Sequence, residues 1–305
     1  MSNKVIFLGS KSLGYSILER MCEINRSSLD SIITFDDRND SRSKLEKFEN
    51  FASKKSIKLY ILDGPKGLSK IIKNHKPDLV MVIGWYWIIP KTLIDFVVKG
   101  FIGIHGSLLP SYRGFAPFVW SLINGDRKTG ISMFYLSKGI DDGDIIDQEE
   151  IIIDDNTNIS TLLNVAELKS IKLINKNYKD ILEGTNNRKS QSTTNITYCS
   201  LRKPDDGIIN WSNTNINIHN FIRAQSDPYP GAFSYLGNKK YYFIESKIVK
   251  EKYYGVMGLV AKKNNNSIVV CCGENAIEIT HLRLEGSDEN VVNSITFGNK
   301  FTSKI

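Results

Sequence analysis

The chain has 305 residues, 41% hydrophobic and 24% charged, with a formal net charge of +7. This length and composition suit two domains with sizeable cores. The first apolar run, Val5–Leu8, is too short for a signal peptide and no run spans a membrane, so we expect a cytoplasmic protein. The charge suits an anionic ligand, although the lysines are scattered. Four cysteines without CxxC spacing indicate buried free thiols.

Apolar runs alternate with helical patterns through the first half of the chain. This alternation predicts an α/β fold with a doubly wound, mainly parallel, Rossmann-like sheet. A later helix, Ile159–Leu182, is expected to cover one face of the sheet. The expected strands are Lys4–Leu8, Leu29–Phe35, Lys58–Leu62, Leu79–Ile83 and Phe101–Ile104, and the expected helices lie near Leu13–Ile24, Ser43–Lys54, Gly67–Asn74 and Lys91–Phe96.

The rhythm changes after Thr185–Thr194, a polar stretch typical of a linker or an exposed loop. Short strands then dominate, separated by Gly- and Asn-rich turns, and five of them predict a small β-barrel. We therefore expect a catalytic domain at 1–195 and a β domain at 196–305. The expected strands are Ala232–Leu236, Lys240–Val249, Gly255–Ala261, Ser267–Cys272 and Ala276–Leu284.

The most informative stretch is GIHGSLLPSYRG, Gly103–Gly114, which places a lone histidine at the end of an apolar strand. Phe101–Ile104 is typical of a buried parallel strand, and Gly106 and Pro110 interrupt it at once. His105 therefore falls at the carboxyl end of the strand, where open α/β sheets bind their ligands.

An acidic segment, GIDDGDII, follows. Asp141 lies 36 residues after His105, which leaves room for one crossover helix, Ala116–Asn124, and one strand, Thr129–Tyr135. A right-handed crossover of that length returns the second strand parallel to the first, so both carboxyl ends face the same side. We therefore expect Asp141 to reach His105. The alternative is an acidic turn that caps the next strand, and Asp144 is expected to hold this loop.

These residues resemble the catalytic core of the formyltransferases that use 10-formyltetrahydrofolate. The resemblance is carried by HGSLLPSYRG, by FVWSLINGDRKTG, and by IDDGDI followed by Gln148. Downstream, Arg202–Trp211 and Ile222–Asn238 resemble the second domain of the members that formylate sugar amines, a barrel of the oligonucleotide/oligosaccharide-binding (OB) type. The match spans nearly the whole chain, and an ordered set of motifs is more specific than any single one.

The resemblance assigns roles to individual residues. It implies that His105 and Asp141 are catalytic, that no metal takes part, and that the Leu109–Pro110 peptide is cis. It places the pterin of the folate co-substrate at the end of the fourth strand, where the alternative for the aromatic residues is a place in the core. The residues assigned to the folate are Gly84, Trp85, Tyr86, Trp87, Ile88 and Asp142. For the acceptor substrate we expect contacts from Ser107, Arg113, Tyr229 and Gly231. The alternatives for Arg113 are a surface charge and a residue that steadies the loop, and as a ligand contact it would meet an anionic substrate group.

One position departs from the family pattern. The family carries Asn two residues before the histidine, where it helps to hold the oxygen of the tetrahedral intermediate, and this chain has Gly103. The loss of one such donor costs about 100- to 1000-fold in rate. We expect a backbone N–H, Ser107 or a water molecule to replace it. The alternative is a folate- or sugar-nucleotide-binding protein without activity.

The resemblance predicts transfer of a formyl group from 10-formyltetrahydrofolate to the primary amine of a nucleotide-linked amino sugar, for surface glycan biosynthesis. The alternative is a methionyl-tRNA formyltransferase, which typically carries a basic insertion after the second strand. Here the corresponding segment, Asp36–Ser43, is as acidic as it is basic. We therefore expect a small-molecule substrate and neither a nucleic-acid nor a membrane partner, and a homodimer stays open.

Overall fold

The computed structural model describes residues 3–303, which divide into two compact units. Of the described residues, the first unit takes 3–114, 130–151 and 164–198. The second takes 115–129, 152–163 and 199–303. The boundary expected at residue 195 stays a prediction, and the two units are described separately below.

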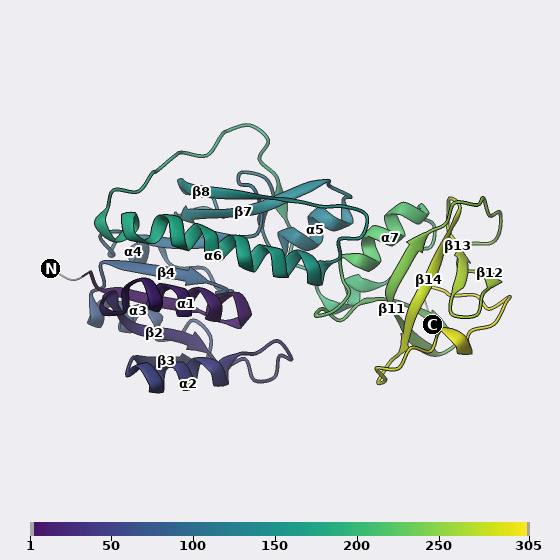
Figure 1. The fold of residues 1–305 in the computed structure, drawn as a ribbon, viewed down its shortest axis with the longest axis horizontal. Coiled ribbons are helices and arrows are strands. Elements are labelled where there is room, and N and C mark those ends of the chain that lie inside the picture. Colours follow the sequence, from purple (N-terminus) through teal and green to yellow (C-terminus); the bar gives the residue numbers. More distant parts are fainter. Residues whose placement is uncertain (1–2, 304–305) are drawn as a thin grey trace. The chain divides into compact units, whose positions relative to one another are not determined.

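A seven-stranded sheet forms the centre of the first unit, in the order β3-β2-β1-β4-β5-β7-β8 (Figure 1). The strands β1 to β5 pair in parallel, so the expected mainly parallel fold is confirmed. The strands of this half are β1 (Val5–Gly9), β2 (Leu29–Phe35), β3 (Lys58–Leu62), β4 (Leu79–Ile83), β5 (Phe101–His105), β6 (Arg113–Gly114), β7 (Lys128–Tyr135) and β8 (Ile145–Ile152).

Helices cover both faces of this sheet, because alternate side chains of the buried strands point to opposite sides. Ile6 and Leu8 of β1 share a core cluster with Leu68 of α3, whereas the ring of Phe7 lies 6.1 Å from that of Phe48 on α2. The α-helices are α1 (Lys11–Asn25), α2 (Leu45–Lys55), α3 (Leu68–His75), α4 (Lys91–Ile94), α5 (Pro117–Ile123), α6 (Ile159–Glu183) and α7 (Asn215–Arg223), and the 3₁₀ helices are Arg26–Ser28, Pro204–Gly207 and Val292–Ser294.

The strand that follows His105 in the sheet runs in the direction opposite to the predicted one. β7 pairs antiparallel with β5, so that Gly103 lies opposite Phe134 and His105 opposite Ser132. The predicted parallel crossover was therefore wrong. A helix between two strands does not by itself fix their relative direction, and here the connection through α5 leads into a strand antiparallel to β5.

The carboxyl ends of β1 and β4 meet where the strand order of the sheet reverses. The backbone N–H of Ser10 donates to the carbonyl of Ile83 over 3.1 Å, and its hydroxyl donates to the carbonyl of Gly84 over 2.6 Å. A Cβ on Gly9 would lie 2.2 Å from the Ile83 oxygen, so only glycine permits this close approach. Sheets of this kind bind ligands at such a reversal.

A five-stranded antiparallel sheet forms the second unit, in the order β10-β11-β14-β13-β12. Both of its edges pair with the C-terminal segment, since Tyr235 bridges Thr302 and Leu259 bridges Lys300. The assignment to the OB type stays a prediction. The strands are β9 (Tyr198–Cys199), outside this sheet, and β10 (Ala232–Leu236), β11 (Lys239–Ile248), β12 (Val260–Lys263), β13 (Ile268–Cys271) and β14 (Ala276–Leu284).

One strand of this sheet begins later than predicted. The expected strand Gly255–Ala261 is observed as Val260–Lys263. Gly258 has φ +80°, and a Cβ there would lie 2.2 Å from the carbonyl oxygen of Phe301, so the chain makes a left-handed turn before the strand starts. The apolar residues before this turn fitted the strand pattern, but Val256 and Met257 are exposed.

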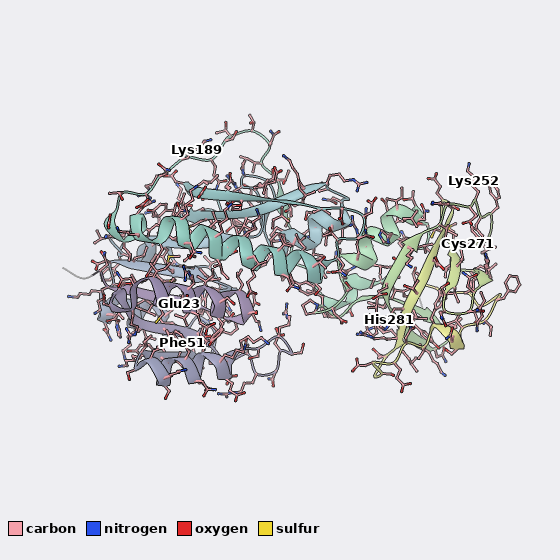
Figure 2. The ribbon with its side chains drawn as sticks, in the orientation of Figure 1. Glu23, Phe51, Lys189, Lys252, Cys271 and His281 are labelled. Carbon is pink, nitrogen blue, oxygen red and sulfur yellow. The ribbon has the colours of Figure 1, made fainter. Side chains whose placement is uncertain are left out.

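Two expectations from composition are met among the described residues. All four cysteines are buried and free, and Figure 2 labels Cys271 in the second unit. Within residues 3–303, no helix is both long enough and apolar enough to cross a membrane.

Candidate active site

His105 ends β5 and is almost completely buried, with 8% of its surface exposed. Its Nε2 lies 2.7 Å from the carbonyl oxygen of Tyr112. A carbonyl oxygen only accepts hydrogen bonds, so Nε2 carries a proton and donates it to Tyr112. The other ring nitrogen, Nδ1, lies 3.5 Å from Oδ2 of Asp141. The expected proximity of the two residues is therefore confirmed, although the loop after β7 brings Asp141 there and a parallel crossover does not.

Asp141 is held in a strained backbone conformation. Its φ is +48°, in the left-handed region that favours glycine, and Tyr112 has φ +59°. The carboxylate Oδ2 of Asp141 accepts a hydrogen bond of 2.8 Å from the backbone N–H of Gly114. Strained residues persist only where the surrounding structure holds them, and they concentrate at functional sites.

The turn after His105 is fixed by buried hydroxyl and amide groups. The Leu109–Pro110 peptide is cis, as the family resemblance implied. The hydroxyl of Ser132 donates to the carbonyl of Ser107 over 2.7 Å and accepts from the backbone N–H of Leu109 over 3.0 Å. The amide of Gln148 donates to Ser132 and to the carbonyl of Leu109. These hydrogen bonds keep the turn after His105 rigid.

Ser107 was predicted to bind substrate or to replace the missing oxyanion donor. Its side chain is fully buried, and its hydroxyl donates to the carbonyl of Ser111 over 2.5 Å. A hydroxyl has one proton, so this donor already serves the turn. The oxyanion donor is therefore better sought among backbone N–H groups and water.

Arg113 is buried, with 6% of its surface exposed. Its Nη2 and Nε donate to Oε1 of Gln191 over 2.6 and 3.2 Å, and its Nη1 lies 3.4 Å from the hydroxyl of Tyr198. Gln191 and Tyr198 are neutral, so none of these contacts pairs the buried guanidinium with a negative charge. Its predicted contact with an anionic substrate group stays a prediction.

The aromatic residues after β4 gather around Phe35, at the end of β2. The Phe35 ring lies 4.8 Å from that of Trp87, 5.7 Å from that of Trp85 and 5.6 Å from that of Tyr86, each nearly edge to face. Gly84 turns the chain with φ +73°, and Ile88 is 90% exposed. The aromatic cluster packs against Phe35 and is partly exposed at Tyr86 and Ile88, an arrangement that suits a flat apolar ligand. Its role in folate binding stays a prediction.

The remaining acidic residues of the loop bond to other side chains. Asp142 accepts a hydrogen bond from the hydroxyl of Ser137, inside the same loop. Asp144 accepts from the hydroxyl of Ser190 over 3.0 Å and lies 3.8 Å from Nε of Arg188. Asp144 thus ties the loop to a neighbouring segment, and the proposed folate contact of Asp142 stays a prediction.

Gly103 leaves little room for the side chain that the family carries there. A Cβ at this position would lie 2.8 Å from Cδ1 of Leu136 and 3.3 Å from Cε1 of Phe134. Leu136 and Phe134 therefore fill the space beside His105, and an asparagine requires Leu136 to move.

Tyr229 and Gly231 belong to the second unit, where a cis Asp227–Pro228 peptide precedes them. Gly231 has φ +102°, which only glycine adopts readily. Their turn borders a hollow of about 230 Å³, whose lining residues are Pro230, Tyr242, Ile244, Arg283, Leu284, Gly286, Ser287 and Asp288. Their predicted place near the nucleotide stays a prediction.

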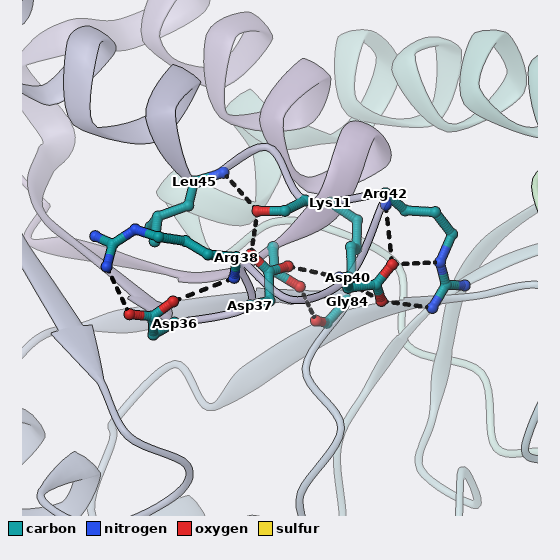
Figure 3. Close-up of polar contacts among 10 residues, drawn as sticks. Lys11, Asp36, Asp37, Arg38, Asp40, Arg42, Leu45 and Gly84 are labelled. Atoms are coloured by element: carbon teal, nitrogen blue, oxygen red, sulfur yellow. Dashed lines mark hydrogen bonds and ion pairs between the residues drawn. The ribbon is translucent and has the colours of Figure 1, made fainter.

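A cluster of paired charges lies at the carboxyl end of β1 (Figure 3). Nζ of Lys11 is 2.6 Å from Oδ2 of Asp37 and 2.8 Å from Oδ2 of Asp40, and Arg42 also bonds Asp40. Burial lowers the pKa of Lys11, but the bonds to the two carboxylates outweigh it and the pKa is raised. The bonds from Arg42 and Lys11 hold the pKa of Asp40 far below its usual range.

Three side chains of the site were missed at the level of sequence. Gln191 lies in the stretch that was interpreted as a linker or exposed loop, Phe35 was counted only as the end of a strand, and Ser132 stood inside an apolar strand pattern. Ser132 carried a usable signal, because a hydroxyl in a buried strand needs a partner. Gln191 and Phe35 carried none, since their roles depend on segments far away in the chain.

The model of the formyl transferase family matches residues 4–175, and that of its C-terminal domain matches residues 202–299. The methionyl-tRNA formyltransferase of Acetivibrio thermocellus is 28% identical over 304 residues, with 97% of each chain covered.

Two solved structures share the fold over most of the chain. WlaRD, described as a sugar 3N-formyl transferase in the presence of dTDP and 5-N-formyl-THF, has a TM-score of 0.67 at 21% identity and covers 94% of this chain and 99% of its own. An N-formyltransferase from Helicobacter canadensis, in complex with folinic acid and dTDP-3-aminofucose, also has a TM-score of 0.67, at 20% identity, and covers 92% of this chain and 100% of its own. The chain belongs to the formyl transferase family.

Proposed function

We propose that the protein transfers the formyl group of 10-formyltetrahydrofolate to the primary amine of a nucleotide-linked amino sugar. The observation that carries the chemistry is the pair of buried His105 and partly exposed Asp141, 3.5 Å apart, at the carboxyl end of β5. Acyl transfer to an amine needs a group that stabilises the developing oxyanion and a base for the amine proton, and this pair supplies both kinds of group.

The proposed reaction proceeds by attack of the neutral amine on the formyl carbon. Because Nε2 of His105 donates its proton to the Tyr112 carbonyl, the proton for the developing oxyanion comes from Nδ1 of the protonated imidazole. Asp141 accepts the proton that the amine sheds as the new C–N bond forms. As the bond to N10 of the folate breaks and the formyl carbonyl re-forms, the oxygen returns its proton to Nδ1 and N10 takes up the proton held by Asp141, so the protons balance.

The charges after β2 support a sugar acceptor over a tRNA. Arg38 pairs with Asp36 and Glu49, and Arg42 pairs with Asp40. Binding of a nucleic acid gains its affinity from cations that neutralise phosphates, and cations already paired with carboxylates contribute less. The overall likeness to WlaRD and to the Helicobacter canadensis protein agrees with a sugar acceptor.

A second candidate acceptor is initiator methionyl-tRNA. The observation that favours it is the 28% identity to the Acetivibrio thermocellus enzyme over 97% of both chains. Sequence identity at this level is shared by family members with different acceptors, so the acceptor is decided by experiment.

The test is incubation of the protein with 10-formyltetrahydrofolate and a panel of nucleotide-linked amino sugars, with charged initiator tRNA as a parallel arm. We expect one amino sugar to gain the mass of one formyl group and the tRNA to remain unchanged. The His105→Asn variant and a reaction without folate are the controls. Formylation of the tRNA alone overturns the sugar proposal, and binding of folate and sugar without transfer identifies a binding protein.

A further inference from the structure

The segment 184–198 is exposed along nearly all of its length, although it lies against the loop that carries Asp141. Of its residues, only Asn186 and Gln191 are not exposed. Lys189, labelled in Figure 2, joins Ile145 through two backbone hydrogen bonds of 2.7 and 2.9 Å. The segment is therefore fastened at a backbone bridge and, two residues later, at an inward-facing glutamine.

Both the oxygen and the nitrogen of the Gln191 side-chain amide make hydrogen bonds near Asp141. Its Nε2 donates to the carbonyl of Asp141 over 2.7 Å and to that of Gly143 over 2.8 Å. Its Oε1 accepts both bonds from Arg113. Since carbonyls only accept and a guanidinium only donates, the neighbours dictate which end of the amide is oxygen and which is nitrogen.

Together with the main chain, these hydrogen bonds form a closed ring of contacts that includes Asp141. The backbone N–H of Gly114 bonds Oδ2 of Asp141, the adjacent Arg113 bonds Gln191, and Gln191 bonds the carbonyl of Asp141. The ring therefore holds Asp141 from its side chain and from its main chain at once. Asp141 has φ +48°, a left-handed conformation that non-glycine residues adopt at a cost, and these contacts help to hold it.

We propose that Gln191 is a positioning residue that holds Asp141 against His105 for the reaction, an inference that rests on the proposed formyl transfer. Gln191 acts through Asp141, by the two hydrogen bonds that its Nε2 donates to the carbonyls of Asp141 and Gly143. An error of about 1 Å in the placement of a catalytic group costs up to about 100-fold in rate.

Two variants separate the two ends of the amide. Gln191→Glu keeps an acceptor for Arg113 but places an oxygen against the carbonyls of Asp141 and Gly143. Gln191→Met removes both kinds of contact at similar size. Ser192→Ala is the matched control, because Ser192 is in the same exposed segment and its hydroxyl bonds Thr194, in the segment itself.

The experiment measures kcat and KM for formyl transfer, hydrogen–deuterium exchange of the amides of residues 137–144, and thermal unfolding as a control for folding. For both Gln191 variants we expect kcat to fall about 10- to 100-fold, KM to stay within about threefold, and the loop amides to exchange faster. Ser192→Ala is expected to match the wild type in all three measurements.

A Gln191→Glu variant with wild-type kcat and wild-type exchange overturns the proposal, and loss in Gln191→Met alone shows that the residue only serves Arg113. If Gln191→Met fails to fold, Gln191→Glu still decides, since it keeps the bond to Arg113. If the wild-type protein formylates no amine, the proposed function fails. In that case the exchange measurement still tests whether Gln191 holds the loop.

Discussion

The surroundings of His105 and the cluster around Lys11 both lie at carboxyl ends of parallel strands in one sheet, yet they treat charge in opposite ways. Lys11 is bonded by Asp37 and Asp40 at 2.6 and 2.8 Å. Around His105, by contrast, Nδ1 stands 3.5 Å from Asp141, and the nearby buried Arg113 bonds Gln191, which is neutral. The charges of the first region are paired with one another within the fold, whereas Arg113 in the second region is held by a neutral partner.

Backbone strain does not separate the two regions. Lys11, Tyr112 and Asp141 all have φ between 48° and 62°, in the left-handed region. What differs is how completely the charges are satisfied. A fully paired cluster stabilises one conformation, while an incompletely paired one can stabilise charge that develops during a reaction. The predictions below test this difference.

The largest effect is expected from His105→Asn. The shorter amide removes the ring nitrogen that faces Asp141, so we expect kcat to fall at least about 100-fold while the fold and folate binding are retained. Steady-state kinetics and a folate titration measure the two quantities. A turnover close to that of the wild type refutes the mechanism.

A smaller loss is expected from Asp141→Asn. The amide oxygen can still accept from the backbone N–H of Gly114, so the loop keeps its place, but the carboxylate that takes the amine proton is gone. We expect kcat to fall between about 10- and 100-fold with little change in KM. If activity is intact, the base is another group, and Asp142→Asn and Asp144→Asn then identify it.

Gly103→Asn tests whether the site lacks an oxyanion donor. The new side chain meets Leu136 at 2.8 Å and displaces it, so we expect less than about a tenfold rise in kcat. A rise that approaches about 100-fold shows that the wild-type enzyme is weakened by the missing amide. Gly103→Ala introduces the same contact without the amide and serves as the control.

Asp40→Asn tests the paired cluster, and its effect concerns stability. The pKa of Asp40 is lowered in the folded protein by Arg42, so its contribution is present above the unfolded value of about 4 and is lost as the pH falls through the folded value. We expect the substitution to reduce the free energy of unfolding by about 1 kcal/mol at pH 7 and by less at pH 3. Urea denaturation at the two pH values measures the difference, and an equal loss at both argues against the ion pairs as its source.

Local sequence patterns predicted much of the fold. The bounds of β2, β3, β4, β10 and β14 agree with the structure to the residue, because runs rich in apolar and β-branched residues between turn residues have a strong local signature. The direction of β7 was not predictable in this way. It depends on how the connection through α5 returns the chain to the sheet, which no local pattern encodes.

For the active site, too, one part could be predicted from local sequence and another part could not. The sequence by itself determined the chemistry, because His105, Asp141 and the Leu109–Pro110 turn carry recognisable residue types at a specific spacing. Only the tertiary structure decided how that chemistry is held. The partners of His105 and Asp141 are the carbonyl of Tyr112, the N–H of Gly114 and the amide of Gln191. Every residue has a backbone carbonyl and all but proline an N–H, so no pattern of side chains shows which of them will meet.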